Sequence, residues 1–146
     1  MFASCSRFAL VVAVAGFMIS GLPARADTLN YTATMTAASE VPVTASKGAG
    51  TLTATYDTAT KTLSWKGAYT DLTGAESAAH FHGPAAAGAS AGVALPIDAA
   101  KSPFEGSAPL TDAQAADLAA GMWYVNIHTA ANPKGEIRGQ VVKGGM

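Results

Sequence analysis

Residues 51–70 have the sequence TLTATYDTATKTLSWKGAYT. Apolar and polar side chains alternate over residues 51–56 and again over residues 63–69, which is the period of a strand with one buried face. The segment 57–61 lies between the two runs and has the polar composition of a turn. We therefore predict an antiparallel hairpin. The same alternation favours a core position for Trp65 over a role as a platform for sugar binding.

Similar alternation predicts strands along most of the remaining chain. They are expected at residues 28–35, 77–82, 93–97, 104–110, 122–129 and 136–142. Gly83-Pro84 and Asn132-Pro133-Lys134-Gly135 are turn signals between them. Residues 85–92 are only Ala, Gly and Ser, so they predict a flexible loop.

One short helix interrupts the strands. Thr111 and Gln114 have the spacing of a capping box, in which each side chain bonds a free amide at the helix start. Residues 113–120 are good helix formers, and Gly121 is a natural end signal. Seven to eight short strands with one short helix predict an all-β fold, a Greek-key β-sandwich or barrel.

The N-terminal segment, residues 1–26, has the features of a secretory signal peptide. Arg7 precedes an uncharged apolar run over residues 8–22, and Ala24-Arg25-Ala26 is the small-x-small pattern that signal peptidases cleave. The run is shorter than the roughly 20 residues that cross a bilayer as a helix, which favours cleavage over a retained anchor. We expect a periplasmic or secreted protein whose mature domain, residues 27–146, has no membrane anchor.

The composition of the mature domain excludes some classes of partner. Two of the nine basic residues and none of the ten acidic ones lie in residues 1–26. The remaining seven basic and ten acidic residues give a net charge of −3, which is no electrostatic footprint for nucleic acid or anionic lipid. Cys5, the one cysteine, also lies in the predicted signal peptide, so the mature domain must be stable without disulfides.

Four segments carry a resemblance to a known family. They are Glu40-Val41-Pro42, AHFHGPA at residues 79–85, GMWYVNIHT at residues 121–129 and NPKGEIRGQ at residues 132–140. These segments resemble the signatures of the CHRD domain family, named after chordin, and the resemblance extends over roughly residues 28–142. Val43 stands where the opening signature of the family has a second proline.

This resemblance implies a secreted β-sandwich domain. Such domains occur as stand-alone bacterial proteins and as repeats in chordin, an extracellular antagonist that binds growth factors. The resemblance implies a binding domain and no particular enzymatic activity.

All three histidines of the chain lie in these motifs. In a strand, His80 and His82 project from one face while Phe81 projects from the other, and Asn126 and His128 likewise share a face. With Phe81 in the core, the histidines point outward, and they converge if the two strands lie side by side, about 4.8 Å apart. An i, i+2 histidine pair with a third histidine is a common donor set for Cu(II) or Zn(II).

Three further residues are candidates for supporting roles around the histidines. Asn126 is a candidate to orient a ligand or to fix a loop. Glu136 and Arg138 alternate with Ile137, which predicts that they share a face. They would then form either an exposed ion pair or a carboxylate contact that supports a histidine.

Two functions remain open on the sequence alone. The first is an exported domain that binds Cu or Zn through His80, His82 and His128. The second is a metal-free extracellular module that interacts with a protein or a glycan, in which the histidines hydrogen-bond neighbouring loops. The mature chain has no cysteine nucleophile and no phosphate-binding loop, so the sequence favours binding over catalysis and leaves a mononuclear redox site as the enzymatic alternative.

Overall fold

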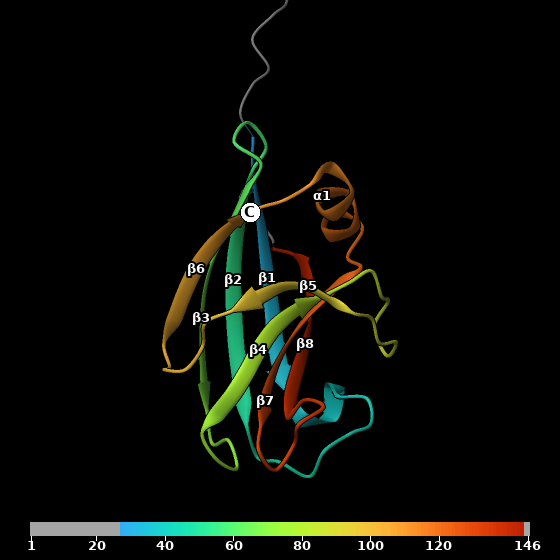
Figure 1. Ribbon diagram of the computed structural model, residues 1–146. Coiled ribbons are helices and arrows are strands. Elements are labelled where there is room, and N and C mark those ends of the chain that lie inside the picture. The colour runs from blue at the N-terminus through green and yellow to red at the C-terminus, as the bar shows by residue number, and fades with distance from the viewer. Residues whose placement is uncertain (1–26, 145–146) are drawn as a thin grey trace, which may run out of the picture.

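The computed structural model describes residues 27–144 (Figure 1), and the predicted signal peptide, residues 1–26, lies outside the described residues. The described elements are the strands β1 (Thr28–Thr36), β2 (Ala49–Asp57), β3 (Thr62–Thr70), β4 (Glu76–His82), β5 (Val93–Ile97), β6 (Phe104–Pro109), β7 (Trp123–Thr129) and β8 (Ile137–Lys143), the 3-10 helix η1 (Ala37–Ser39) and the α-helix α1 (Asp112–Ala119). Each strand begins and ends within two residues of its predicted bounds. Neither of these two helices has the length and apolar character that a membrane span requires.

The strands described form one antiparallel sheet with the order β5-β4-β7-β8-β1-β2-β3-β6. β7 is inserted between β4 and β8, so the order is not that of the chain. In Figure 1, β4 and β7 cross in front of β1 and β2 because the sheet curls back over itself. The rings of Trp65 on β3 and Phe81 on β4 therefore meet edge to face, 5.3 Å apart. This nearly closed sheet confirms the predicted all-β fold.

Alternate residues of each strand fill the interior of the curled sheet. On β1, β2 and β3 the buried side chains are Tyr31, Ala33, Met35, Leu52, Ala54, Tyr56, Leu63 and Trp65. Phe81 lies between two indole rings, with its centroid 5.3 Å from that of Trp65 and 5.8 Å from that of Trp123. Trp65 is thus a core residue, as its place in the alternation predicts.

The outer face of β7 is buried as well. Every residue from Trp123 to Ile127 is buried. The loop 83–92 covers this face: Ala85 N donates to Met122 O (2.7 Å), and the amide of Gln140 on β8 donates to Ala85 O (3.0 Å). The loop is therefore tied to the sheet, which differs from the flexible loop that its composition predicts.

The residues that predict the hairpin turn and the helix start form the expected hydrogen bonds. Asp57 Oδ1 accepts hydrogen bonds from the amides of Ala59 (2.8 Å) and Thr60 (2.9 Å), and so stabilises the turn between β2 and β3. At α1, Gln114 N donates to Thr111 Oγ1 (3.2 Å), and Thr111 N donates to Gln114 Oε1 (2.9 Å). The predicted capping box is thus present.

Replacing Trp123 should test this packing. The side chain is 1% exposed, and it lies so close to Gly83 that a Cβ there would collide with the indole. Trp123→Ala should lower the free energy of unfolding by about 3–5 kcal/mol, because it leaves a cavity in the core. Equilibrium urea unfolding measures this loss. Val43→Ala, at a 67% exposed position, is the control and should change stability by less than about 0.5 kcal/mol. Equal effects of the two substitutions would contradict the burial of the indole.

Candidate metal centre

The register between β4 and β7 places the three histidines on one face of the sheet. His80 is paired with Asn126, and His82 is paired with Tyr124. Ala78 is paired with His128, so His128 lies one position further along the same face. This face is opposite to the aromatic core, as the alternation predicts.

The ring nitrogens of the three histidines lie close enough to share one ion. His80 Nδ1 is 3.3 Å from His128 Nε2, and one ring nitrogen of each histidine lies within 4.8 Å of the other two. Nitrogens bound at about 2.0–2.1 Å to a single ion are roughly 3–3.5 Å apart. The pair His80 Nδ1 and His128 Nε2 already has this spacing. The structure therefore brings together the three residues predicted as ligands.

Two backbone carbonyls set the tautomers of His82 and His128. His82 Nδ1 lies 3.0 Å from Ala91 O, and His128 Nδ1 lies 3.0 Å from Pro133 O. A carbonyl only accepts hydrogen bonds, so in both rings Nδ1 carries the proton and donates it. The Nε2 atom of each neutral ring then has a free lone pair. Histidine ligands of metals are commonly oriented by such a bond from the second ring nitrogen.

The Nε2 atom of His82 has no hydrogen-bond partner among the described residues, although it is buried. His82 itself is 9% exposed. An unpaired buried acceptor costs about 1–3 kcal/mol. The hydrogen bond to Ala91 agrees with a structural role for His82 in fixing the loop. That role leaves the cost of the unpaired Nε2 unexplained, whereas a metal ion would offset it.

The environment keeps His80 and His128 in the neutral, ligating form. Burial lowers the pKa of His80, and the nearby His128 and His82 lower it further. Burial also lowers the pKa of His128, which the hydrogen bond to Pro133 opposes and His82 reinforces. Both rings are therefore uncharged at neutral pH and have a lone pair available for a metal.

Arg138 and Tyr124 pack against the histidine cluster as a stack. The rings of His82 and Tyr124 are parallel, with centroids 4.8 Å apart and an interplanar angle of 3°. Arg138 covers the other face of Tyr124, with Cζ 3.3 Å from the ring centroid, and donates a hydrogen bond to Ala89 O. Arg138 thus lies next to the histidine cluster through its contact with Tyr124. Tyr124 was not predicted as part of the site, although it alternates with Asn126 along β7.

Glu136 makes neither of its two predicted contacts. Among the described residues, its carboxylate forms no hydrogen bond with a histidine and no ion pair with Arg138. Glu136 precedes β8 and is completely buried. Its carboxylate accepts hydrogen bonds from the side chains of Ser46, Thr73, Thr129 and Asn132 and from the amide of Thr73. The prediction of an exposed ion pair is therefore wrong. The carboxylate instead fastens three loops at one end of the sheet.

Glu40 is a buried residue next to the site that the sequence analysis left without a role. Its side chain is 4% exposed. Burial raises the pKa of this carboxyl, while the amide of Val41, Arg138 and the side-chain amide of Asn126 act in the opposite direction. The motif Glu40-Val41-Pro42 was the available signal, but a single glutamate in a loop predicts solvent exposure.

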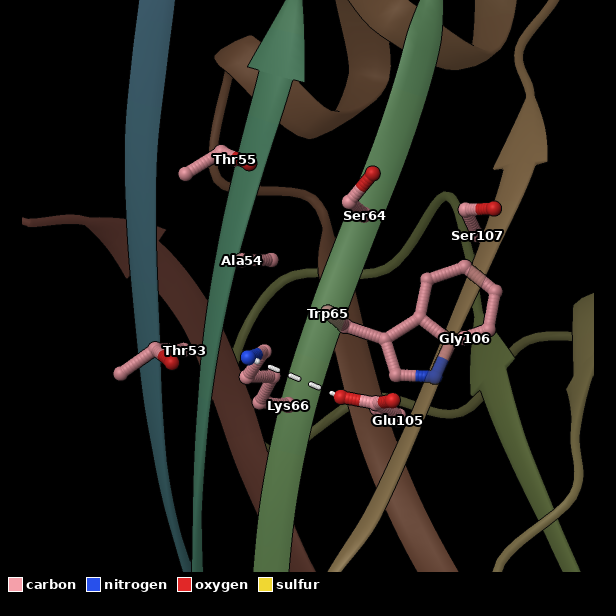
Figure 2. A pocket seen from close by; sticks show the side chains of 9 residues that line it. All are labelled: Thr53, Ala54, Thr55, Ser64, Trp65, Lys66, Glu105, Gly106 and Ser107. Atoms are coloured by element: carbon pink, nitrogen blue, oxygen red, sulfur yellow. Dashed lines mark ion pairs between the residues drawn. The ribbon is translucent and has the colours of Figure 1, made fainter.

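A separate hollow lies on the outer face of β2, β3 and β6 (Figure 2). Thr53, Thr55, Ser64, Lys66, Glu105 and Ser107 supply its polar rim. Lys66 Nζ and Glu105 Oε2 are 3.6 Å apart, and both side chains are more than 70% exposed, so their attraction is weak in water. The hollow contains no histidine. The candidate metal ligands therefore lie on the face of β4 and β7 and not in this hollow.

Replacing Glu136 should show how strongly it stabilises the fold. Burial raises the pKa of this carboxyl, but the hydrogen bonds from Ser46, Thr129 and Thr73 outweigh it and lower the pKa to about 2. Relative to the ordinary value of 4.5, this corresponds to about 3 kcal/mol of stability. That stability is fully present above pH 4.5 and is lost as the pH falls towards 2.

Glu136→Gln should therefore destabilise the protein by about 3 kcal/mol at pH 7 and by a little less than half of that at pH 3, as measured by urea unfolding. Glu105→Gln, at an exposed carboxylate, is the matched control and should have little effect at either pH. A destabilisation by Glu136→Gln that is the same at both pH values would contradict the low pKa.

Comparison with known proteins agrees with the motifs that surround these residues. A model of the CHRD domain family matches residues 31–141, a range that contains all three histidines. A search of curated proteins and a search of solved structures each returned no match. Domains of this family are generally extracellular or secreted. Because the matched range covers most of the chain, the protein belongs to the CHRD domain family.

Proposed function

We propose that this protein is an exported metal-binding domain that holds Cu(II) or Zn(II) through His80, His82 and His128. The observation that carries the proposal is the buried and unpaired Nε2 of His82, which lies in a cluster of three imidazoles whose ring nitrogens are close to one another. His80 Nδ1 is 3.3 Å from His128 Nε2 and can donate a proton to it, but no such donor reaches the buried His82 Nε2 among the described residues. A cation between the three rings would bind that lone pair as well. Imidazole nitrogens suit Zn(II) and Cu(II).

A serine motif near the site resembles that of hydrolases, but its place in the fold favours binding over catalysis. Residues 88–92, GASAG, match the G-x-S-x-G pattern of hydrolases. Here, however, the segment connects two strands, β4 and β5, whereas the hydrolase motif connects a strand to a helix. Ser90 is exposed in this loop.

The predicted signal peptide and the family membership support a periplasmic or secreted location for the domain.

A metal-free interaction module is the second candidate function. The hydrogen bonds from His82 to Ala91 and from His128 to Pro133 support it, because they fix two loops without any metal. In that case the histidines serve the fold, and the covered face of β7 presents its loops to a protein or a glycan. The two candidates differ in their response to added metal.

Adding metal to the purified domain should separate these functions. Saturating Zn(II) or Cu(II) should raise the melting temperature in a concentration-dependent way, because the ion binds the folded state. His80→Ala, His82→Ala and His128→Ala should each abolish most of this shift, since each removes one donor. Asn30→Ala, at an exposed position on β1, should keep the full shift. Calorimetric titration of the unsubstituted domain without any heat of binding would refute the metal site.

The affinity for metal should depend on pH in a direction that follows from the histidine pKa values. The pKa values of His80 and His128 are lowered from 6.5, so both rings stay neutral to a lower pH than free histidine. The logarithm of the affinity should be nearly constant from pH 8 down to 6.5 and should decline below that. Titrations at a series of pH values measure the position of this break. A break above pH 6.5 would contradict the neutral, partly desolvated cluster.

A further inference from the structure

We propose that Asn126 is the fourth protein ligand of this metal site, through Oδ1, and that Glu40 holds the amide in the ligating orientation. This inference rests on the proposed function. It concerns the number and kind of donors, which decide whether the site is closed by protein or open to a substrate.

Asn126 lies within the sheet at a position that faces the histidines. Asn126 is the direct partner of His80 in the ladder between β4 and β7, and its side chain projects from the same face as the three histidines. Its Oδ1 atom lies 3.0 Å from His128 Nε2, which is the spacing of two donors on one ion. Asn126 is 3% exposed. Its oxygen is therefore already inside the cluster of lone pairs.

The short contact between Asn126 and His128 joins two hydrogen-bond acceptors. His128 Nδ1 donates to Pro133 O, so Nε2 of the neutral ring is an acceptor. Asn126 Oδ1 is an acceptor as well. Two acceptors at 3.0 Å repel each other unless a proton or a cation lies between them. A metal ion bound to both atoms turns this repulsive contact into two attractive ones.

The neighbouring carboxylate fixes the orientation of the Asn126 amide. The amide nitrogen lies next to Glu40 and acts on its carboxyl as a hydrogen-bond donor. Exchanging the amide oxygen and nitrogen would turn Oδ1 towards a carboxylate and would cost this attraction. Glu40 Oε1 is buried without a hydrogen-bond partner among the described residues, and the amide nitrogen of Asn126 is a donor close to it. Glu40 is thus a positioning residue that acts on the metal through Asn126.

Gly135 makes room for this pair of side chains. A Cβ at this position would collide with both Glu40 Oε1 and Asn126 Nδ2. The backbone of Gly135 also has a φ of 127°, a conformation that residues with a side chain rarely adopt. The turn between β7 and β8 therefore serves the site in two ways. Gly135 leaves space for the side chains of Glu40 and Asn126, and the carbonyl of Pro133 accepts the hydrogen bond from His128.

The four donors make a closed site. Three imidazole nitrogens and one amide oxygen fill the four positions of tetrahedral Zn(II) with protein atoms, and four protein ligands are typical of structural sites, whereas catalytic sites keep one position open. The metal is then held without an open position for a substrate. This donor set agrees with a binding function for the domain.

Variants at positions 126 and 40 test the inference on the full mature domain with Zn(II) and Cu(II) as probes. Asn126→Leu removes the oxygen and keeps the approximate size of the side chain. The double variant Asn126→Asp with Glu40→Gln restores an oxygen at position 126 and a donor at position 40, so it reverses the direction of the hydrogen bond. Asn30→Leu, at an exposed position on β1, is the matched control.

Asn126→Leu should lower the affinity by about 10-fold or more, while the double variant should bind at least as tightly as the unsubstituted protein. The electron paramagnetic resonance spectrum of bound Cu(II) should also change in the double variant, because a carboxylate replaces a neutral amide as ligand. A structural role for Asn126 predicts instead an unchanged spectrum. If Asn126→Leu does not fold, the spectrum of the double variant still distinguishes a ligand role of Asn126 from a structural one.

An unchanged affinity of Asn126→Leu together with an unchanged spectrum of the double variant would overturn the inference and leave the three-histidine site standing. Absence of metal binding by the unsubstituted protein would overturn the proposed function and the inference together.

Discussion

The register between β4 and β7 is the constraint on which the rest of the structure depends. It pairs His80 with Asn126 and His82 with Tyr124 on one face, while Phe81 and Val125 meet on the other. A shift by one residue would exchange the two faces and place the polar side chains in the core. The packing of Phe81 against Trp123 and Trp65 therefore stabilises the histidine cluster at the same time as the core.

Two polar layers depend on this register, one at the histidines and one at the end of the sheet. At the end of the sheet, the Glu136 carboxylate has five donors and is fully satisfied. At the histidines, by contrast, the buried His82 Nε2 and Glu40 Oε1 are left without partners among the described residues. Buried polar groups are usually paired, and the exceptions require an explanation. This contrast supports the proposed metal site at the histidines.

The strands, the helix cap and the convergence of the histidines could be predicted because alternation states which side chains share a face. What covers a face could not be predicted in this way. Residues 85–92 are Ala, Gly and Ser and carry no side-chain signal, yet their backbone carbonyls orient His82 and bind Arg138. Backbone donors and acceptors are the same in every residue, so composition does not reveal them. The prediction for Glu136 failed because it lies before β8 and does not follow the alternation of the strand.

The central claim is that the Nε2 lone pairs of His82 and His128 converge with His80 on one ion. Long-range nitrogen-15 nuclear magnetic resonance of the histidine rings tests it most directly, since it reports the tautomer of each ring and the nitrogen that binds a metal. The account predicts that both His82 and His128 carry the proton on Nδ1 in the metal-free protein. It also predicts that one equivalent of Zn(II) shifts Nε2 of both rings and one nitrogen of His80 together. Protonated Nε2 atoms in the metal-free protein, or a response of only one ring to Zn(II), would contradict it.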